Sequence, residues 1–191
     1  MRLLNLNYKD SSGTKKTLTQ HAFLIEDVAE MAKRNNCKAS AVSKTPTMLT
    51  NHRQSTTVSI FEYMIGNTDW STPGGHNIKL INEKDDPASK PYVVPYDFDF
   101  SGLVNTNYSA PDERLGIENV RERTYRGLPR PISEVNDVLD IFNKEKANMY
   151  AVINNFNLLT PRNKRDMTDY LDQFFKTISD PEDVKKIFSY E

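Results

Sequence analysis

The polar residues around Asp69 have the types and the order that metal-dependent phosphoryl transfer requires. Such a reaction uses one carboxylate to accept or orient the proton of the attacking hydroxyl, an amide oxygen to bind a metal ion, and a further carboxylate to join that metal to the nucleotide phosphates. The chain presents Asp69 first, as the candidate base. The candidate metal ligands follow it in the order Asn77, Asp97 and Asp99, ahead of Gly102.

The spacing of these residues predicts a hairpin and an insertion. Two short apolar runs, residues 78–81 and 92–94, favour a strand pair that returns the asparagine and the following aspartate to one metal. The asparagine stands eight positions after Asp69, whereas the usual kinase loop, H-R-D-x-x-x-x-N, is shorter. Because Pro73-Gly74-Gly75 lies between them, we expect the extra residues to fold outward without moving the ends of the loop.

Each of these residue types also has a purely structural interpretation. Asp, Asn, Gly and Pro favour turns for local reasons, and a lone histidine such as His76 is more often a hydrogen-bonding loop residue than a ligand. The arginine run between residues 121 and 130 is either a solvated face or a contact for an acidic substrate or phosphate. The ordered set, not any single residue, therefore carries the phosphoryl-transfer interpretation.

Elements that would position this set are predicted along the first half of the chain. Alternating apolar residues over 3–8 and 17–25 indicate a β-hairpin with a turn at 10–13. Apolar spacing indicates helices over 26–36 and 56–65, with Gly66 as a left-handed C-terminal cap, and residues 37–54 are expected to be mostly loop.

The final third of the chain is predicted to be helical. Ser133 is a candidate cap for a helix whose inward stripe runs from Val135 to Val152 and Phe156. Thr160-Pro161 and Asp180-Pro181 are cap and first-turn pairs for two more helices. Strands first, a loop-rich centre and helices last define an α+β fold.

Composition narrows the class of protein. The 191 residues carry 25 Lys and Arg against 26 Asp and Glu, a net charge of −1, which removes the electrostatic case for nucleic-acid binding. No apolar run approaches the ~20 residues of a membrane-spanning helix, and no signal peptide precedes the first strand. The single cysteine, Cys37, excludes an internal disulfide. A cytoplasmic location is the default expectation, although a preceding segment could carry an export signal.

The motifs Asn67-Thr68-Asp69, His76-Asn77 and Tyr96–Gly102 resemble the catalytic centre of the spore coat protein H (CotH) family of atypical protein kinases. They are more distantly similar to HipA-type and phosphatidylinositol kinases. The resemblance implies ATP-dependent phosphoryl transfer to the hydroxyl of an unknown protein substrate, with Mg²⁺ or Mn²⁺. It makes Asp69 the base, with Asn67 beside it as a second catalytic residue, and it implies that Phe23, Ile25 and Glu26 contact the adenine.

The resemblance also implies one kinase-like domain over residues 1–191. Its parts would be a β-hairpin and hinge strand (1–25), helices and a loop (26–65), catalytic and metal loops (66–110) and a helical subdomain (111–191). The fold would be a mostly helical kinase C-terminal lobe preceded by a hairpin remnant of the N-terminal lobe. In related bacterial proteins more of that lobe precedes the first strand, so we expect this chain alone to be inactive and its hairpin edge to favour self-association.

Two alternatives remain open from the sequence. A catalytically silent kinase-like module would use the same pocket for binding without turnover. A metal-dependent hydrolase would use His76, Asp69, Asp97 and Asp99, but the three histidines are scattered at 21, 52 and 76, and hydrolase centres usually need more ligands of this kind.

Overall fold

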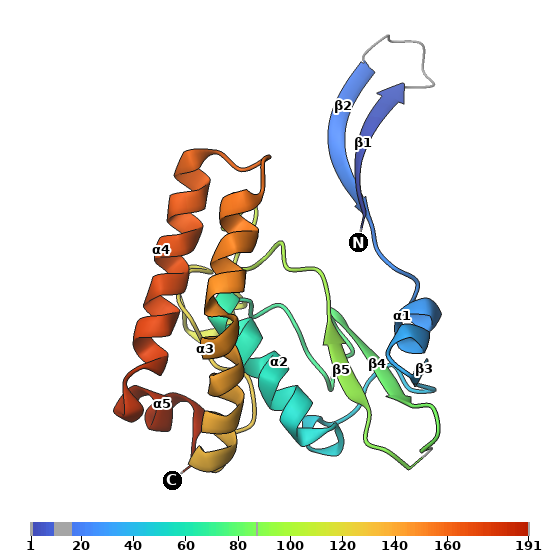
Figure 1. Cartoon of the computed structure of the whole chain (residues 1–191), viewed down its shortest axis with the longest axis vertical. Helices are drawn as coiled ribbons and strands as arrows, with labels where there is room; N and C mark the ends of the chain where they lie inside the picture. The colour runs from blue at the N-terminus through green and yellow to red at the C-terminus, as the bar shows by residue number, and fades with distance from the viewer. Residues whose placement is uncertain (1, 10–16, 87, 191) are drawn as a thin grey trace.

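The chain forms a β-hairpin, a small antiparallel sheet and a group of helices (Figure 1). The structure is a computed structural model and describes residues 2–9, 17–86 and 88–190. Within that part, the strands are β1 (Arg2–Lys9), β2 (Thr17–Leu24), β3 (Cys37–Ala39), β4 (Ile78–Glu83) and β5 (Tyr92–Pro95). The α-helices are α1 (Val28–Arg34), α2 (His52–Ile65), α3 (Ile132–Asn155), α4 (Pro161–Ile178) and α5 (Pro181–Phe188). Helix α1 precedes the small sheet in the sequence, and α2 lies between its first two strands, β3 and β4. The α+β class predicted from the sequence is confirmed.

The hairpin of β1 and β2 projects away from the helices (Figure 1). Its strands pair antiparallel from Arg2 opposite Leu24 to Lys9 opposite Thr17, and they form a two-stranded sheet separate from the other strands. The strand pair matches the prediction. The turn predicted at residues 10–13 lies outside the described residues.

The second sheet positions the polar loops. Its strand order is β3-β4-β5, and Ile78 of β4 lies opposite Pro95 of β5. The residues just outside this pair, Asn77 and Tyr96, are joined by a 3.0 Å hydrogen bond from the Tyr96 N–H to the Asn77 carbonyl. The predicted β4–β5 pairing is therefore confirmed, whereas β3 falls in a segment predicted to be loop, because three residues are too few to show an alternating pattern.

Helix α2 leads directly into the polar centre. It begins at His52, earlier than predicted, because the Asn51 side chain accepts a 3.1 Å hydrogen bond from the Gln54 N–H and caps it. It ends at Gly66, whose φ of 66° is left-handed. This confirms the predicted glycine cap.

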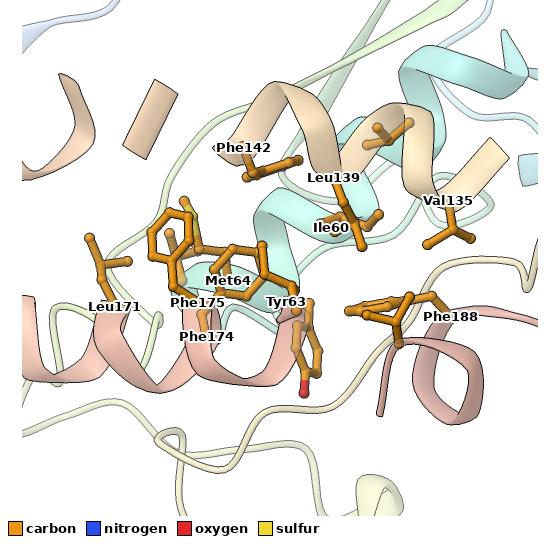
Figure 2. Close-up of a cluster of buried hydrophobic side chains, with 14 of the residues drawn as sticks. Ile60, Tyr63, Met64, Val135, Leu139, Phe142, Leu171, Phe174, Phe175 and Phe188 are labelled. Atoms are coloured by element: carbon orange, nitrogen blue, oxygen red, sulfur yellow. The ribbon is translucent and has the colours of Figure 1, made fainter. Parts of the chain in front are cut away.

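The main core lies between α2, α3, α4 and α5 (Figure 2). Phe174 of α4 and Phe188 of α5 are fully buried, and the Tyr63 ring of α2 meets the Phe188 ring edge-on at a centroid distance of 5.1 Å. Thr160 and Asp180 cap α4 and α5 as predicted. These helices form the rigid support for the loop that follows α2.

Helix α3 departs from the prediction at both ends. Pro131 occupies its N-cap position without a side-chain hydrogen bond, so Ser133 is not the cap. Val152 and Phe156 are 73% and 44% exposed and do not belong to the inward stripe. Figure 1 shows α3 and α4 side by side and extending beyond the end of α2, so α2 does not cover the last turns of α3. Among the described residues, no helix combines the length and the apolar character needed to cross a membrane.

Candidate active site

The loop after α2 is held by a buried side chain, Asn67, which is 1% exposed. Its Nδ2 donates to Glu62 Oε2 at 3.0 Å, and its Oδ1 accepts from the Asp69 N–H at 3.0 Å. Asn67 was predicted as a catalytic residue beside Asp69. The structure places it beneath the loop, where it fixes the backbone that carries Asp69.

Glu62 is the buried residue that supports Asn67 from below, and the sequence did not indicate this role. It sits on α2 with 1% exposure, and its Oε1 has no hydrogen-bond partner among the described residues. Burial raises the pKa of its carboxyl to about 8, against the opposing effect of the hydrogen bond from Asn67. The only available signal was a glutamate placed five positions before the asparagine.

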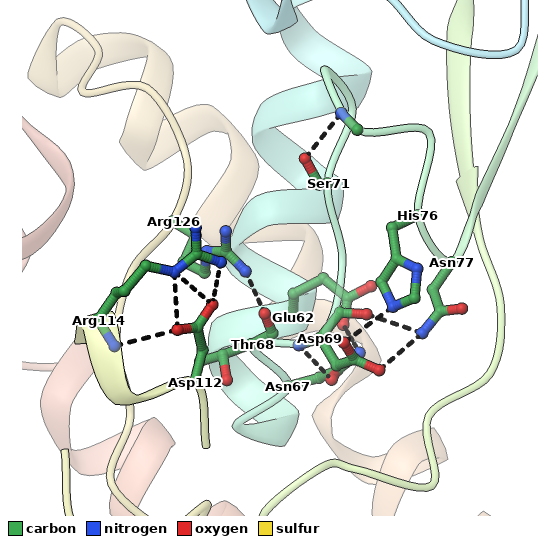
Figure 3. Close-up of polar contacts among 11 residues, drawn as sticks. Glu62, Asn67, Thr68, Asp69, Ser71, His76, Asn77, Asp112, Arg114 and Arg126 are labelled. Carbon is green, nitrogen blue, oxygen red and sulfur yellow. Dashed lines mark hydrogen bonds and ion pairs between the residues drawn. The ribbon is translucent and has the colours of Figure 1, made fainter. Parts of the chain in front are cut away.

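Asp69 lies between His76 and Asn77 (Figure 3). Its Oδ1 is 2.9 Å from His76 Nε2, and its Oδ2 accepts from Asn77 Nδ2 at 3.0 Å. The same Nδ2 also donates to the Asp69 carbonyl at 2.8 Å. The Asp69 side chain is 38% exposed, so a substrate hydroxyl can reach it.

The orientation of the Asn77 amide matters for metal binding. Both Asp69 atoms that it meets are acceptors, so the amide nitrogen must face Asp69. The amide oxygen is therefore turned away from Asp69 and is available to a cation. Asn77 adopts a left-handed backbone with φ 52°, which directs the chain from the loop into β4.

Asp97, just after the end of β5, places a second carboxylate near Asp69. Its backbone is also left-handed, with φ 63°. Partial desolvation raises the pKa of its carboxyl, and the neighbouring Asp99 and Asp69 carboxylates raise it further, while His76 opposes them. Asp97 is thus close enough to Asp99 and to Asp69 to be repelled by both, and a bound cation would relieve this repulsion.

Asp99 is anchored at the outer side of the same loop. Its Oδ2 accepts from the Tyr108 hydroxyl at 3.1 Å, and its carbonyl accepts from Thr106 Oγ1 at 3.1 Å. It also raises the pKa of the Asp97 carboxyl, so the two carboxylates are neighbours in this loop.

Two glycines let the loops cross closely. The Gly102 N–H donates to the Gly66 carbonyl at 3.1 Å, and the Leu103 N–H donates to the Ile65 carbonyl at 2.9 Å. A Cβ added at Gly102 would lie 2.4 Å from the Val120 carbonyl oxygen, closer than any real contact. The crossing ties the Asp69 loop to the Asp97 loop.

The insertion before His76 folds as expected. Ser71 and His76 form an isolated antiparallel bridge, with N–H···O distances of 3.0 and 2.9 Å. Gly75 takes a left-handed φ of 64° inside the turn. The ends of the insertion are held together, so His76 and Asn77 stay next to Asp69.

The three residues predicted to contact adenine lie elsewhere. Phe23 and Ile25 are 53% and 60% exposed at the end of β2 and in the linker that follows it. Glu26 forms a 2.9 Å ion pair with Arg34 of α1. No contact recorded between described residues joins any of the three to Asp69, Asn77 or Asp97, so their role stays a prediction.

Asn77, Asp97 and Asp99 are the side chains that could hold a hard divalent cation here. Within the described residues, no three His, Cys, Asp or Glu side chains are gathered as a ligand cage. Mg²⁺ does not require one, because it is usually held by one or two carboxylates together with water and substrate phosphates. An amide oxygen of Asn77 and the Asp97 and Asp99 carboxylates are of the kind that suits this ion.

Comparisons with family models, curated proteins and solved structures found no match to this chain. The class of protein must therefore be argued from the site. The site joins a held aspartate, an oriented asparagine and a carboxylate pair within one set of crossing loops.

Proposed function

We propose that this protein is a kinase-like phosphotransferase of the CotH type, which transfers the γ-phosphoryl group of ATP to a protein hydroxyl. The observation that carries the proposal is the hydrogen bonding of Asp69 and Asn77, next to the carboxylates of Asp97 and Asp99. Residues that are distant in the sequence thereby meet in the order of roles that phosphoryl transfer needs.

Asp69 is the proposed base. His76 and Asn77 fix its carboxylate, and each carboxylate oxygen keeps a further lone pair for the hydrogen of an incoming hydroxyl. Holding the acceptor oxygen in line with the phosphorus contributes much of the rate enhancement in such reactions. The contacts from His76 and Asn77 serve that positioning.

Asn77 and Asp97 would hold the metal ion, with Asp99 as a second carboxylate. Mg²⁺ or Mn²⁺ bound there would neutralise charge on the nucleotide phosphates. The raised pKa of Asp97 supports the assignment. Burial is its main cause, and repulsion by Asp99 and Asp69 adds to it, which a cation would cancel.

Paramagnetic broadening by Mn²⁺ tests the metal site on this chain as it stands. We expect sub-stoichiometric Mn²⁺ to broaden the amide signals of Asn77, Asp97 and Asp99 first, and Mg²⁺ in excess to reverse the effect. Asp97→Asn should weaken binding at least about tenfold, as expected for the loss of a carboxylate ligand. Asp85→Asn is the matched control, because Asp85 is exposed beyond β4.

Transfer of radiolabelled γ-phosphate to a protein substrate tests the reaction itself. In any form of the protein that shows transfer, Asp69→Asn should abolish it while leaving Mn²⁺ binding in place. Metal binding without transfer in every form would favour the silent binding module. Absence of Mn²⁺ broadening at these three residues would remove the proposal.

A further inference from the structure

A cavity of about 570 Å³ opens beside Asp69. Asp69 and His76 form one part of its lining, and Asp112, Arg114 and Arg126 form another, with Phe100 also in the wall. Figure 3 shows the two arginines and Asp112 on one side of Thr68, and His76 and Asn77 on the other. The phosphotransferase proposal uses only Asp69 and His76 of this lining.

Arg126 is anchored next to the proposed base. Its Nη1 donates to the carbonyl of Thr68, the residue before Asp69. The rest of the side chain is exposed at the cavity. Because a guanidinium has five N–H donors, several remain for a bound group. Arg126 is thereby held against the backbone of the residue that precedes Asp69.

Arg114 adds a second guanidinium to the same wall. Its Nε donates to both carboxylate oxygens of Asp112, at 2.9 and 3.1 Å. Arg114 lowers the pKa of the Asp112 carboxyl to about 2, with a smaller contribution from Arg126, so both cations face this one carboxylate. Two guanidinium groups against one carboxylate leave this wall with a net positive charge.

The neighbouring arginines of the same run have structural roles instead. Arg121 forms a 2.7 Å ion pair with Asp166. Arg123 donates to the carbonyls of Met64 and Tyr170 at 3.2 and 2.6 Å. Of the run predicted as a possible substrate contact, Arg126 is the member that lines the cavity.

We propose that this cavity binds the acceptor segment, and that it selects a protein segment with a carboxylate side chain near the acceptor hydroxyl. The inference rests on the proposed function, because Asp69 receives the hydroxyl. Arg126 and Arg114 bind the acidic side chain, and Phe100 contacts the segment between them. Without these two cations, the aspartates of the site would repel an acidic segment.

Peptide binding tests the inference without any phosphoryl transfer. Three peptides of equal length carry a central serine flanked by Glu, Gln or Lys, and each is titrated into the ¹⁵N-labelled chain. We expect the Glu peptide to bind about tenfold more tightly than the Gln peptide, as one charge-assisted contact predicts. The Lys peptide should bind most weakly, and added salt should reduce the difference. The largest shifts should fall at His76, Phe100 and Arg126.

Two arginine variants test which cations give the preference for the Glu peptide. Arg126→Gln should remove most of the advantage of the Glu peptide over the Gln peptide. Arg114→Gln is the second variant, because its side chain is 88% exposed and its loss does not touch the Asp69 loop. Arg165→Gln, an exposed change on α4, is the control and should have no effect.

The outcomes separate this inference from the phosphotransferase proposal. Equal affinity for the three peptides, or a Glu preference that survives both arginine variants, would overturn the inference even if Mn²⁺ binds as proposed. A Glu preference that depends on Arg126 and Arg114, together with Mn²⁺ binding, would support it. The same preference without Mn²⁺ binding would overturn the acceptor role and leave only the acidic-peptide binding. In that case the cavity would be an acidic-peptide site of a protein without the proposed metal centre.

Discussion

Glu62 links the protonation of one buried carboxyl to the position of the loop that carries Asp69. Its carboxyl meets Asn67, and Asn67 in turn holds the Asp69 N–H. Burial raises the pKa of Glu62 from about 4.5 to about 8. The folded chain therefore keeps the Glu62 carboxyl protonated across a range of pH in which the same carboxyl is ionised in the unfolded chain.

The free energy of unfolding should consequently fall as pH rises from 4.5 towards 8. The stabilisation from this group is complete below the unfolded pKa of about 4.5 and is lost as pH rises through the folded pKa of about 8. Within that window, the free energy of unfolding should fall by on the order of 1 kcal/mol per pH unit. Glu62→Gln should flatten the slope, because an amide stays neutral and its oxygen still accepts from Asn67.

Urea denaturation at pH 5, 7 and 9 measures this effect. We expect the native chain and Glu62→Gln to be similarly stable at pH 5 and the variant to be the more stable at pH 9. Glu118→Gln, an exposed loop change, should leave the pH profile of the native chain unaltered. Parallel profiles for the native chain and Glu62→Gln would show that Glu62 is ionised in the folded state.

At the scale of elements, the crossing of the loops at Gly66 and Gly102 decides whether the site can assemble. Gly102→Ala would place a methyl group 2.4 Å from the Val120 carbonyl oxygen and 2.6 Å from the Tyr170 hydroxyl. Because one of these neighbours is backbone, we expect a loss of about 1–3 kcal/mol in the free energy of unfolding. The midpoint of chemical denaturation measures it.

Gly74→Ala is the matched control for this crossing. Its added methyl group would meet only the Ser71 side chain, at 3.0 Å. That hydroxyl accepts from the Gly74 N–H at 2.9 Å, and because Ser71 and Gly74 lie in the same turn, a small shift can relieve the contact. The change should stay within about 0.5 kcal/mol, as is usual for surface positions. An equal loss in the free energy of unfolding for both variants would mean that the two loops are not closely packed at Gly102 in solution.

The hairpin of β1 and β2 is the element most open to a partner. Its strands pair only with each other among the described strands, and Phe23, Leu24 and Ile25 are 53%, 57% and 60% exposed. Unpaired strand edges and exposed apolar side chains both favour addition of another chain. We expect concentration-dependent dimerisation, measured by size-exclusion chromatography with light scattering.

Phe23→Lys should weaken that dimer about tenfold or more, because burial of one phenylalanine contributes ~1.5–3 kcal/mol. Val152→Lys changes a comparably exposed apolar side chain on α3 and should leave the dimer intact. A monodisperse monomer at all concentrations, with slow amide exchange over residues 3–8, would contradict the prediction.

At the scale of the whole molecule, local signals in the sequence were sufficient for much of the fold. The caps at Gly66, Thr160 and Asp180 form as predicted, because a cap depends only on residues within a few positions. The β4–β5 pairing was predictable because its two apolar runs lie near each other in the sequence. Pattern alone missed β3, which is too short to show one.

Contacts over long sequence distances set the limit of such prediction. Arg126 reaches the Thr68 carbonyl across 58 positions, and no local pattern singles it out from its three neighbours in the arginine run. Glu62 has the same character, because a glutamate within a helix is expected on the solvent face. The exposure of Val152 and Phe156 depends on where α2 ends, and the apolar pattern of α3 carries no information about that.

The left-handed backbone at Asp97 has a consequence for the balance between stability and function. A non-glycine residue with φ 63° is strained by ~1 kcal/mol or more, and its carboxyl is repelled by its neighbours. Asp97→Gly should therefore raise the melting temperature by about 2–4 °C while abolishing Mn²⁺ binding, as calorimetry and Mn²⁺ titration can measure. Asn105→Gly, at φ 50° on an exposed loop, should stabilise without that loss.

Thermal stability would then favour the loss of Asp97, the proposed metal ligand. A lineage that no longer needed the metal would drift towards glycine at position 97, whereas one that uses it would keep the strained aspartate. A lower or unchanged melting temperature for Asp97→Gly would mean that the site exacts no such trade-off.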